Sequence, residues 1–273
     1  MRELAGKLVA VAVGAVALVL ASGGVSLAAQ VAQSGTGVLV PSSPGATLPL
    51  QGGSTDSLNW SGYAVTPGSG ITAVSSTFTV PKAGILPPGF AATWTGIGGY
   101  NTADLIQAGT AEQSLPSLPL VGDHYYAWYE LLPNSEVQLS GCAGDPKCTV
   151  TPGDRISVGI RQIGSGEWSI AMTDAGKWSW SSDVSYGSSE SSAEWILEAP
   201  TLVVQTLPAP VGTVAFGPTS TYTAGGVTRT IAQGHPTKID LSPGLINLYA
   251  PSALAPDGQS FDVCAYALSC AAP

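Results

Sequence analysis

From residue 57 onwards, apolar residues occur in short runs, and within many runs they alternate with polar ones. A period of two places successive side chains on opposite faces of a β-strand. Candidate strands rich in β-branched and aromatic residues lie at 72–80, 92–96, 125–132, 155–163, 168–174, 194–199 and 212–218. No segment has the three- and four-residue apolar spacing of an amphipathic helix. The pattern predicts an all-β chain.

Turn-forming residues separate the candidate strands. Proline, glycine and aspartate cluster at 67–68, 87–89, 152–154 and 256–258, and such short connections favour antiparallel pairing. The 34 glycines and 21 prolines alone would suit a disordered chain, but 44% apolar residues and seven tryptophans are enough for a packed core. We therefore expect a two-sheet antiparallel β-sandwich.

The first residues have the pattern of a secretory signal peptide. Arg2 and Lys7 precede an apolar run at 8–21, and small residues end at Ala28 and Ala29. The run is shorter than the roughly 20 residues of a stable membrane span, although the same segment would act as an anchor if cleavage failed. We expect a signal peptide at 1–29, a Ser/Gly/Pro-rich linker or short pro-segment at 30–56 and one domain at 57–273. The mature protein is expected to be secreted and extracellular, without membrane contact.

The charge balance argues against one class of partner. A formal net charge of −9 disfavours binding to nucleic acid. Only 10% of the residues are charged. This is compatible with an acidic environment, because acid denaturation largely reflects protonation of paired carboxylates.

The four cysteines form two equally spaced pairs in a chain that carries an export signal. Cys142 and Cys148 are six residues apart, as are Cys264 and Cys270. Zinc is a poor alternative because neither pair has Cys-x-x-Cys spacing and both histidines lie far from the cysteines. Two local disulfides are therefore predicted.

Several hydrolase mechanisms lack their residues in this chain. There is no Gly-x-Ser-x-Gly elbow and no His-Glu-x-x-His motif. A thiolate nucleophile is disfavoured by the cysteine pairing, and the only histidines, His124 and His235, are interpreted as structural. Carboxylates and amides on strands remain as candidate chemistry, with no metal or other cofactor.

Alternation indicates which of these side chains share a strand face. Glu194 and Glu198 point to one side of their strand, while Trp195 and Leu197 point to the other, towards the core. A second strand presents an aromatic and acidic face of its own. Its members are Tyr126, Trp128 and Glu130. Such faces suit a site on a concave sheet, and they also suit the solvated side of a sandwich.

Five motifs in the same order resemble the glutamic peptidases, the eqolisin or G1 family. They are Asn-Trp-Ser-Gly at 59–62, Trp-Thr-Gly-Ile-Gly-Gly at 94–99, Leu-Ile-Gln-Ala-Gly at 105–109, Tyr-Tyr-Ala-Trp-Tyr-Glu at 125–130 and Ala-Glu-Trp-Ile-Leu-Glu at 193–198. Each motif alone is weak, but their order and spacing together are specific. The resemblance covers about 57–218.

The resemblance implies a bent, concanavalin-like or jelly-roll-like sandwich with its active site on the concave face. Glu198 would be the general base that activates water, and Gln107 would stabilise that water and the oxyanion. The substrate would be a polypeptide, hydrolysed by a monomer without a covalent intermediate. The residues expected to line the substrate site are Trp60, Trp94, Trp128, Glu130, Tyr126, Gly99, Gly109 and Glu194.

Two positions depart from the family pattern. Gly98 stands where the motif Gly-Ile-Asp-Gly has its aspartate, and Tyr126 stands where Tyr-Asp-Ala-Trp has another. Both departures bear on the pH optimum and on the cleavage preference. A register error would exchange Glu194 with Glu198 as the base.

Two other functions fit the same residues. A carbohydrate-binding or catalytically inactive sandwich also presents aromatic and acidic side chains on a concave face. A glycoside hydrolase would pair Glu194 or Glu198 with Glu130, at a carboxyl separation of about 5 to 9.5 Å. Gln107 favours the peptidase, because a sugar site has no need of an amide facing a lone glutamate.

Overall fold

The computed structural model describes residues 48–49, 54–67, 70–84, 86–114, 123–200, 207–243 and 247–273. Within these ranges the regular structure is β apart from one 3-10 turn, η1 (Ala232–Gly234). The all-β prediction is confirmed. The expected signal peptide and residues 30–47 lie outside the described residues. The short strands β1 (Leu48–Pro49) and β2 (Ser54–Ser57) lie at the end of the stretch expected to be a linker.

The first layer is an antiparallel sheet. Its strands, in spatial order, are β16 (Thr237–Leu241), β3 (Trp60–Val65), β12 (Ala193–Glu198), β5 (Gly89–Gly98), β6 (Leu105–Ser114), β7 (Asp123–Leu131) and β8 (Val137–Gln138). Strand β12 enters this sheet between β3 and β5, so its two neighbours come from a distant part of the sequence.

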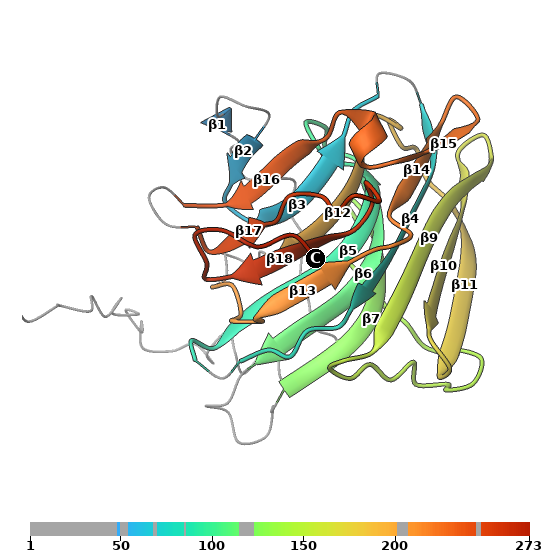
Figure 1. The fold of residues 1–273 in the computed structure, drawn as a ribbon. Coiled ribbons are helices and arrows are strands. Elements are labelled where there is room, and N and C mark those ends of the chain that lie inside the picture. Colours follow the sequence, from blue (N-terminus) through green and yellow to red (C-terminus); the bar gives the residue numbers. More distant parts are fainter. Residues whose placement is uncertain are drawn as a thin grey trace, which may run out of the picture. The chain divides into compact units, whose positions relative to one another are not determined.

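The second layer continues from the same sheet around a bend. Its strands are β11 (Trp178–Ser185), β10 (Glu167–Asp174), β9 (Arg155–Gly164) and β4 (Ile71–Thr79), followed by the hairpin of β14 (Thr221–Ala224) and β15 (Val227–Thr230) and by β13 (Thr213–Phe216), β18 (Phe261–Ala265) and β17 (Tyr249–Pro251). Strand β17 pairs with β16, which joins the two layers along one edge (Figure 1). The predicted bent antiparallel sandwich is confirmed. Strand β2 adds a parallel pairing to β16.

The two faces of the first sheet have different surroundings. Trp195 and Leu197 of β12 belong to the main apolar core between the layers, as alternation predicted. Glu194, Ile196 and Glu198 point to the opposite face, where Ile196 packs in a smaller apolar cluster. The other members of this cluster are Trp60, Ala64, Ala92, Trp94, Leu105, Ala111, Tyr126, Trp128, Leu132 and Ile239. We call this second side the site face.

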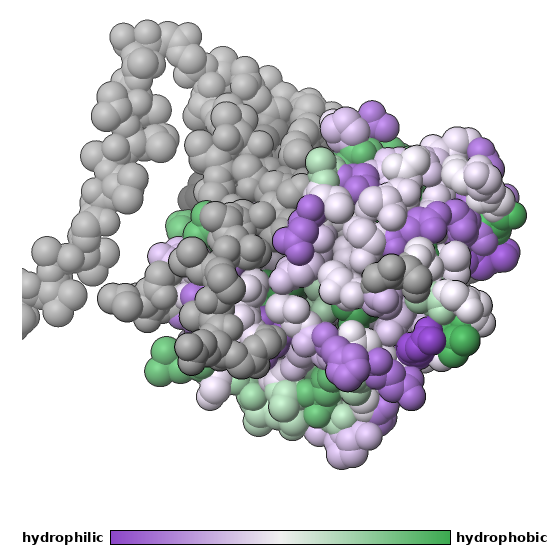
Figure 2. Space-filling model, turned by 90° about the horizontal axis from the view of Figure 1, so that it is seen from above, coloured by the Kyte–Doolittle hydropathy of each residue, from purple (hydrophilic) through white to green (hydrophobic). Residues whose placement is uncertain are grey.

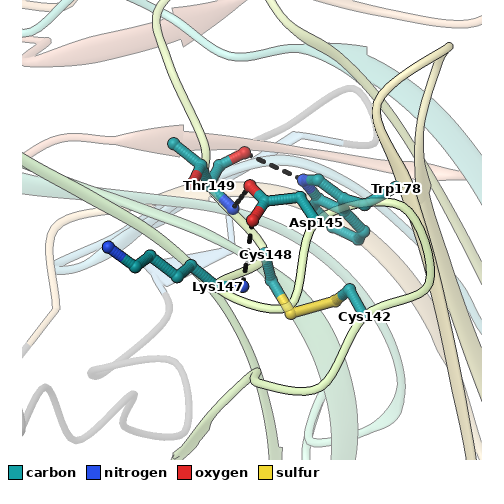
Figure 3. Close-up of a disulfide and its surroundings, with 6 residues drawn as sticks. All are labelled: Cys142, Asp145, Lys147, Cys148, Thr149 and Trp178. Carbon is teal, nitrogen blue, oxygen red and sulfur yellow. Dashed lines mark hydrogen bonds between the residues drawn. A yellow bond between two sulfur atoms is a disulfide. The ribbon is translucent and has the colours of Figure 1, made fainter.

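Both predicted disulfides are present. Cys142 bonds to Cys148 in the connection between β8 and β9, and Cys264 bonds to Cys270 near the C-terminus. Figure 3 shows how Asp145 organises the first loop: its carboxylate accepts the backbone N–H groups of Lys147 and Thr149 at 3.0 and 2.9 Å. The loop is thus fixed both by a covalent link and by its own turn.

The surface seen in Figure 2 is of mixed polarity. In the view of Figure 2, polar and weakly polar residues cover most of the described surface, and apolar residues form separate areas. Across the described ranges, no helix is long and apolar enough to span a bilayer. No group of three or more His, Cys, Asp and Glu side chains in those ranges is arranged to hold a metal ion.

Candidate active site

Strand register brings the predicted catalytic residues onto one face. Glu198 on β12 lies opposite Trp60 on β3 and Ala92 on β5. Gln107 on β6 lies opposite Gly96 on β5 and Glu130 on β7. Alternation from these pairs puts the acidic residue of β12 and the amide of β6 on the site face.

The Glu198 carboxylate receives hydrogen bonds on both oxygens. The indole N–H of Trp94 donates to Oε2 at 2.8 Å, and the side-chain amide of Asn59 donates to Oε1 at 3.3 Å. Asn59 is itself oriented by the Ser57 hydroxyl, which donates to its carbonyl oxygen at 3.1 Å. Donors directed at a carboxylate stabilise its ionised form, which is the form that accepts a proton.

Glu130 has a different electrostatic environment. Burial raises its pKa to about 9, and the nearby charge of Glu198 adds to the effect. The Gln107 amide donates to Glu130 Oε2 at 2.7 Å and opposes the shift only in part. Glu130 therefore carries a proton at acidic and neutral pH.

The acceptor oxygen of Gln107 and the second oxygen of Glu130 are buried without a hydrogen-bond partner in the described part of the chain. Such groups are uncommon in folded proteins. Both atoms belong to side chains of the site face, and Glu130 is close enough to Glu198 for the charge of Glu198 to raise its pKa. This part of the site face is thus a candidate for binding a further polar group.

Aromatic side chains surround these polar groups. Trp60 and Trp94 meet edge to face, with ring centroids 4.9 Å apart and planes at 77°, and Trp128 lies in the same apolar cluster. The indole N–H groups of Trp60 and Trp128 have no partner among the described residues. All three rings are fully buried.

The two glycines predicted for the site allow close packing around these rings. A Cβ on Gly109 would lie 2.1 Å from the Thr93 carbonyl oxygen and 2.7 Å from Trp94 Cα. A Cβ on Gly99 would lie 3.2 Å from the Trp60 ring. Gly109 thus permits the β5–β6 approach that fixes Trp94, so its role is in packing.

Tyr126 and Glu194 lie on the same face. The Tyr126 hydroxyl donates to Glu136 at 2.8 Å and accepts from Gln113 at 3.3 Å. Glu194 is fully buried, and its pKa is raised mainly by that burial. Among the described residues no donor reaches hydrogen-bond geometry with the Glu194 carboxyl, although the Ser192 hydroxyl and the Tyr100 backbone N–H oppose the effect of burial on its pKa.

Comparison with known proteins decides the family. The model of the Peptidase A4 family matches residues 58–248, which is more than half of the chain. This chain belongs to the Peptidase A4 family. A search of curated proteins finds no match.

Solved structures agree on the fold of this Peptidase A4 member. Scytalido-glutamic peptidase with a transition state analog inhibitor superimposes with a TM-score of 0.60 at 19% identity, over 76% of this chain and 98% of that one. SCP-B, a member of the eqolisin family of peptidases in complex with the tripeptide Ala-Ile-His, gives a TM-score of 0.56 at 18% identity, over 77% and 98%. Membership confirms the resemblance seen in the motifs: the chain is a glutamic peptidase. It favours this function over the sugar-binding and glycosidase alternatives.

Three polar residues of the site went unassigned from the sequence of this Peptidase A4 chain. Asn59 lies in the first motif, so the motif signalled its importance without giving its role as a donor to Glu198. Glu136 and Asp104 lie in the turns after β7 and β5, outside every motif. Nothing in the alternation pattern brings turn residues to a strand face.

Proposed function

We propose that this protein is a secreted acid endopeptidase in which Glu198 is the general base and Gln107 the oxyanion donor. One observation carries the proposal: two buried carboxyl groups of the site face differ in their hydrogen bonds. Glu198 accepts N–H donors on both oxygens, whereas Glu130 accepts one from Gln107 and burial raises its pKa to about 9. Pairs of titratable groups whose environments separate their protonation states are typical of acid–base sites.

The chemistry needs no covalent intermediate. The Glu198 carboxylate takes a proton from water as the water oxygen forms a bond to the peptide carbonyl carbon. The electron pair of the carbonyl π bond moves to oxygen, and an N–H of Gln107 donates to that oxyanion. The protonated Glu198 then gives its proton to the amide nitrogen, the C–N bond breaks, and the carboxylate is regenerated.

A neutral Glu130 suits the role of Gln107. If Glu130 ionised, its charge would hold the Gln107 N–H more strongly, because hydrogen bonds to a charged group are about twice as strong. The negative charge would also oppose the oxyanion. Activity should therefore require Glu198 ionised and Glu130 protonated. The second condition holds up to about pH 9, so we assign the expected fall in activity above about pH 5 to the loss of stability as the buried carboxyls ionise.

An extended polypeptide would lie across the site face against the tryptophan rings. Trp60, Trp94 and Trp128 offer the apolar walls, and the groups of the candidate site are fully buried. Binding of a polypeptide therefore requires this face to open. The preferred side chains at the cleavage site depend on that opened surface.

Digestion of denatured casein by the purified protein tests the proposal. We expect cleavage near pH 3 to 5 that is insensitive to chelators. Peptide products mapped by mass spectrometry should include internal cuts, as an endopeptidase makes. A protein that cleaves nothing across pH 2 to 7, or only trims chain ends, would contradict it.

The secretion part of the proposal rests on the N-terminal sequence. Residues 1–29 have the charged, apolar and small-residue regions of a signal peptide. N-terminal sequencing of exported protein should find the start at or after residue 30. Protein retained in the cell with Met1 intact would remove this part of the proposal without affecting the chemistry.

A further inference from the structure

Gly98 at the end of β5 leaves room for the carboxylate of Asp104. Its φ of +86° lies in the left-handed region that glycine adopts readily. A Cβ at this position would lie 2.7 Å from Asp104 Oδ2 and 2.7 Å from the Asp104 carbonyl oxygen. The Asp104 carboxylate therefore occupies the space where a side chain of residue 98 would begin. This is the position at which the resembling motif has its own aspartate.

Asp104 uses that position to hold the segment at 186–192, which connects β11 to β12. Its Oδ2 accepts the Ser189 backbone N–H at 2.6 Å and faces the Ser188 hydroxyl at 3.4 Å. Burial alone would raise the pKa of Asp104, but hydrogen bonds from Ser189, Thr102 and the Asp104 backbone together outweigh it and the pKa is lowered. The group is ionised, so these bonds are charge-assisted.

Other contacts fix the same segment. The Tyr186 hydroxyl accepts the Leu105 N–H at 2.7 Å and donates to the Leu132 carbonyl at 2.8 Å. The Gly98 N–H donates to the Ser192 carbonyl at 2.9 Å. Strand β12 begins at the next residue, Ala193. The segment is therefore tied to the ends of β5, β6 and β7 immediately before the strand that carries Glu198.

The placement of β12 matters for the chemistry. A one-residue slip in register moves every side chain of a strand to the other face, and smaller shifts change the approach of Glu198 to the Trp94 N–H. We propose that Asp104 is a positioning residue of the active site, whose carboxylate fixes the 186–192 segment and thereby sets Glu198 in place. This rests on the proposed role of Glu198 as the base.

A purely structural turn aspartate would give a different result. Asp257 is a matched control: its carboxylate accepts the N–H groups of Gln259 and Ser260 at 2.8 Å each and the Ser260 hydroxyl at 2.6 Å. Its bonds stay within its own turn. The titratable groups influenced by the charge of Asp104 are Glu194 and Tyr186.

The experiment compares three variants of the full chain: Asp104→Ala, Asp104→Asn and Asp257→Ala. For each, kcat and KM are measured with a peptide at pH 4, and backbone hydrogen exchange is followed at 186–198. We expect Asp104→Ala to lower kcat about tenfold with little change in KM, and to speed exchange at 186–192. Asp104→Asn should lose less, because its amide oxygen still accepts the Ser189 N–H.

The comparison of Asp104 with Asp257 decides the proposal. Asp257→Ala should keep full kcat. Unchanged kcat or unchanged exchange in Asp104→Ala, or an equal loss of kcat in Asp257→Ala, would overturn the proposal. If the unmodified protein cleaves no peptide, the proposed function fails by itself, and exchange of the β12 amides still decides whether Asp104 holds the strand.

Discussion

The two faces of the first sheet bury carboxyl groups in different ways. On the core side, Glu112 is fully buried and accepts hydrogen bonds from the hydroxyls of Thr93 at 3.4 Å and Thr110 at 2.5 Å. On the site face, Glu130 is equally buried, yet one of its oxygens has no partner among the described residues and the other receives the amide of Gln107. Both carboxyls have raised pKa values, chiefly because of burial.

The difference separates a structural carboxyl from the one that we propose to act in catalysis. A raised pKa alone does not distinguish them, since burial in either layer produces it. What distinguishes them is the surroundings: hydroxyls that complete the hydrogen bonds of Glu112, against an amide and a second carboxylate beside Glu130. On the site face, some buried polar atoms have no partner among the described residues and could bind another molecule. On the core face, the hydroxyls of neighbouring threonines already bind the Glu112 carboxyl.

Among the residues of the site face other than Glu198, substitution of Gln107 should lower kcat the most. Gln107→Ala removes the oxyanion donor, so kcat should fall about 100- to 1000-fold. The acid limb of the pH profile should stay in place, because Gln107 does not titrate. Steady-state kinetics from pH 2 to 7 measure both quantities. A near-normal kcat would remove the amide from the mechanism.

The pH profiles of kcat/KM for Glu130→Gln and Glu112→Gln should differ most at alkaline pH. A glutamine at 130 is a neutral mimic of the protonated acid, so activity at pH 4 should stay within about tenfold. The alkaline limb of kcat/KM that reflects ionisation of Glu130, whose pKa is raised to about 9, should disappear. Glu112→Gln should leave the profile unchanged. The kcat/KM profiles of the two variants are compared in assays short enough that the protein stays folded. Identical profiles would contradict the proposed difference between Glu130 and Glu112.

The smallest expected effect is the change in the free energy of unfolding with pH. Buried carboxyls on both faces of the sheet contribute to this change. The folded-state pKa values of Glu112, Glu130 and Glu194 lie above 4.5. Their contribution is therefore complete below about pH 4.5 and is lost as pH rises towards the folded values. Urea unfolding should give a larger free energy at pH 4 than at pH 7, with a smaller difference in Glu112→Gln. A protein more stable at pH 7 would contradict this.

The sequence predicted those features that depend on local pattern. Alternation assigned Trp195 to the core and Glu198 to the opposite face, and spacing alone identified Cys142–Cys148 and Cys264–Cys270. Motif order pointed to the Peptidase A4 fold before any geometry was known.

Features that depend on tertiary contacts were missed. Strand β6 was not among the candidate strands. Both of its faces are buried, even at the polar residues Glu112 and Gln113. Its sequence therefore lacks the alternation of polar and apolar residues that marks a half-buried strand. The hairpin of β14 and β15 turns at Gly225 and Gly226. This Gly-Gly pair is a turn signal in the sequence, but no apolar run follows it that would have indicated a strand. Asp104 acts across a turn, which no periodicity describes.

The most direct test of the account is turnover at pH 4 by Glu198→Gln beside Glu194→Gln. The two residues share a strand and a face and are both fully buried, so the pair isolates the role of the base. We predict that Glu198→Gln loses about 100- to 10,000-fold in kcat, the range for acid–base catalysis, with an unchanged circular dichroism spectrum, and that Glu194→Gln loses far less. Equal losses, or a larger loss at Glu194, would contradict the assignment of Glu198 as the base.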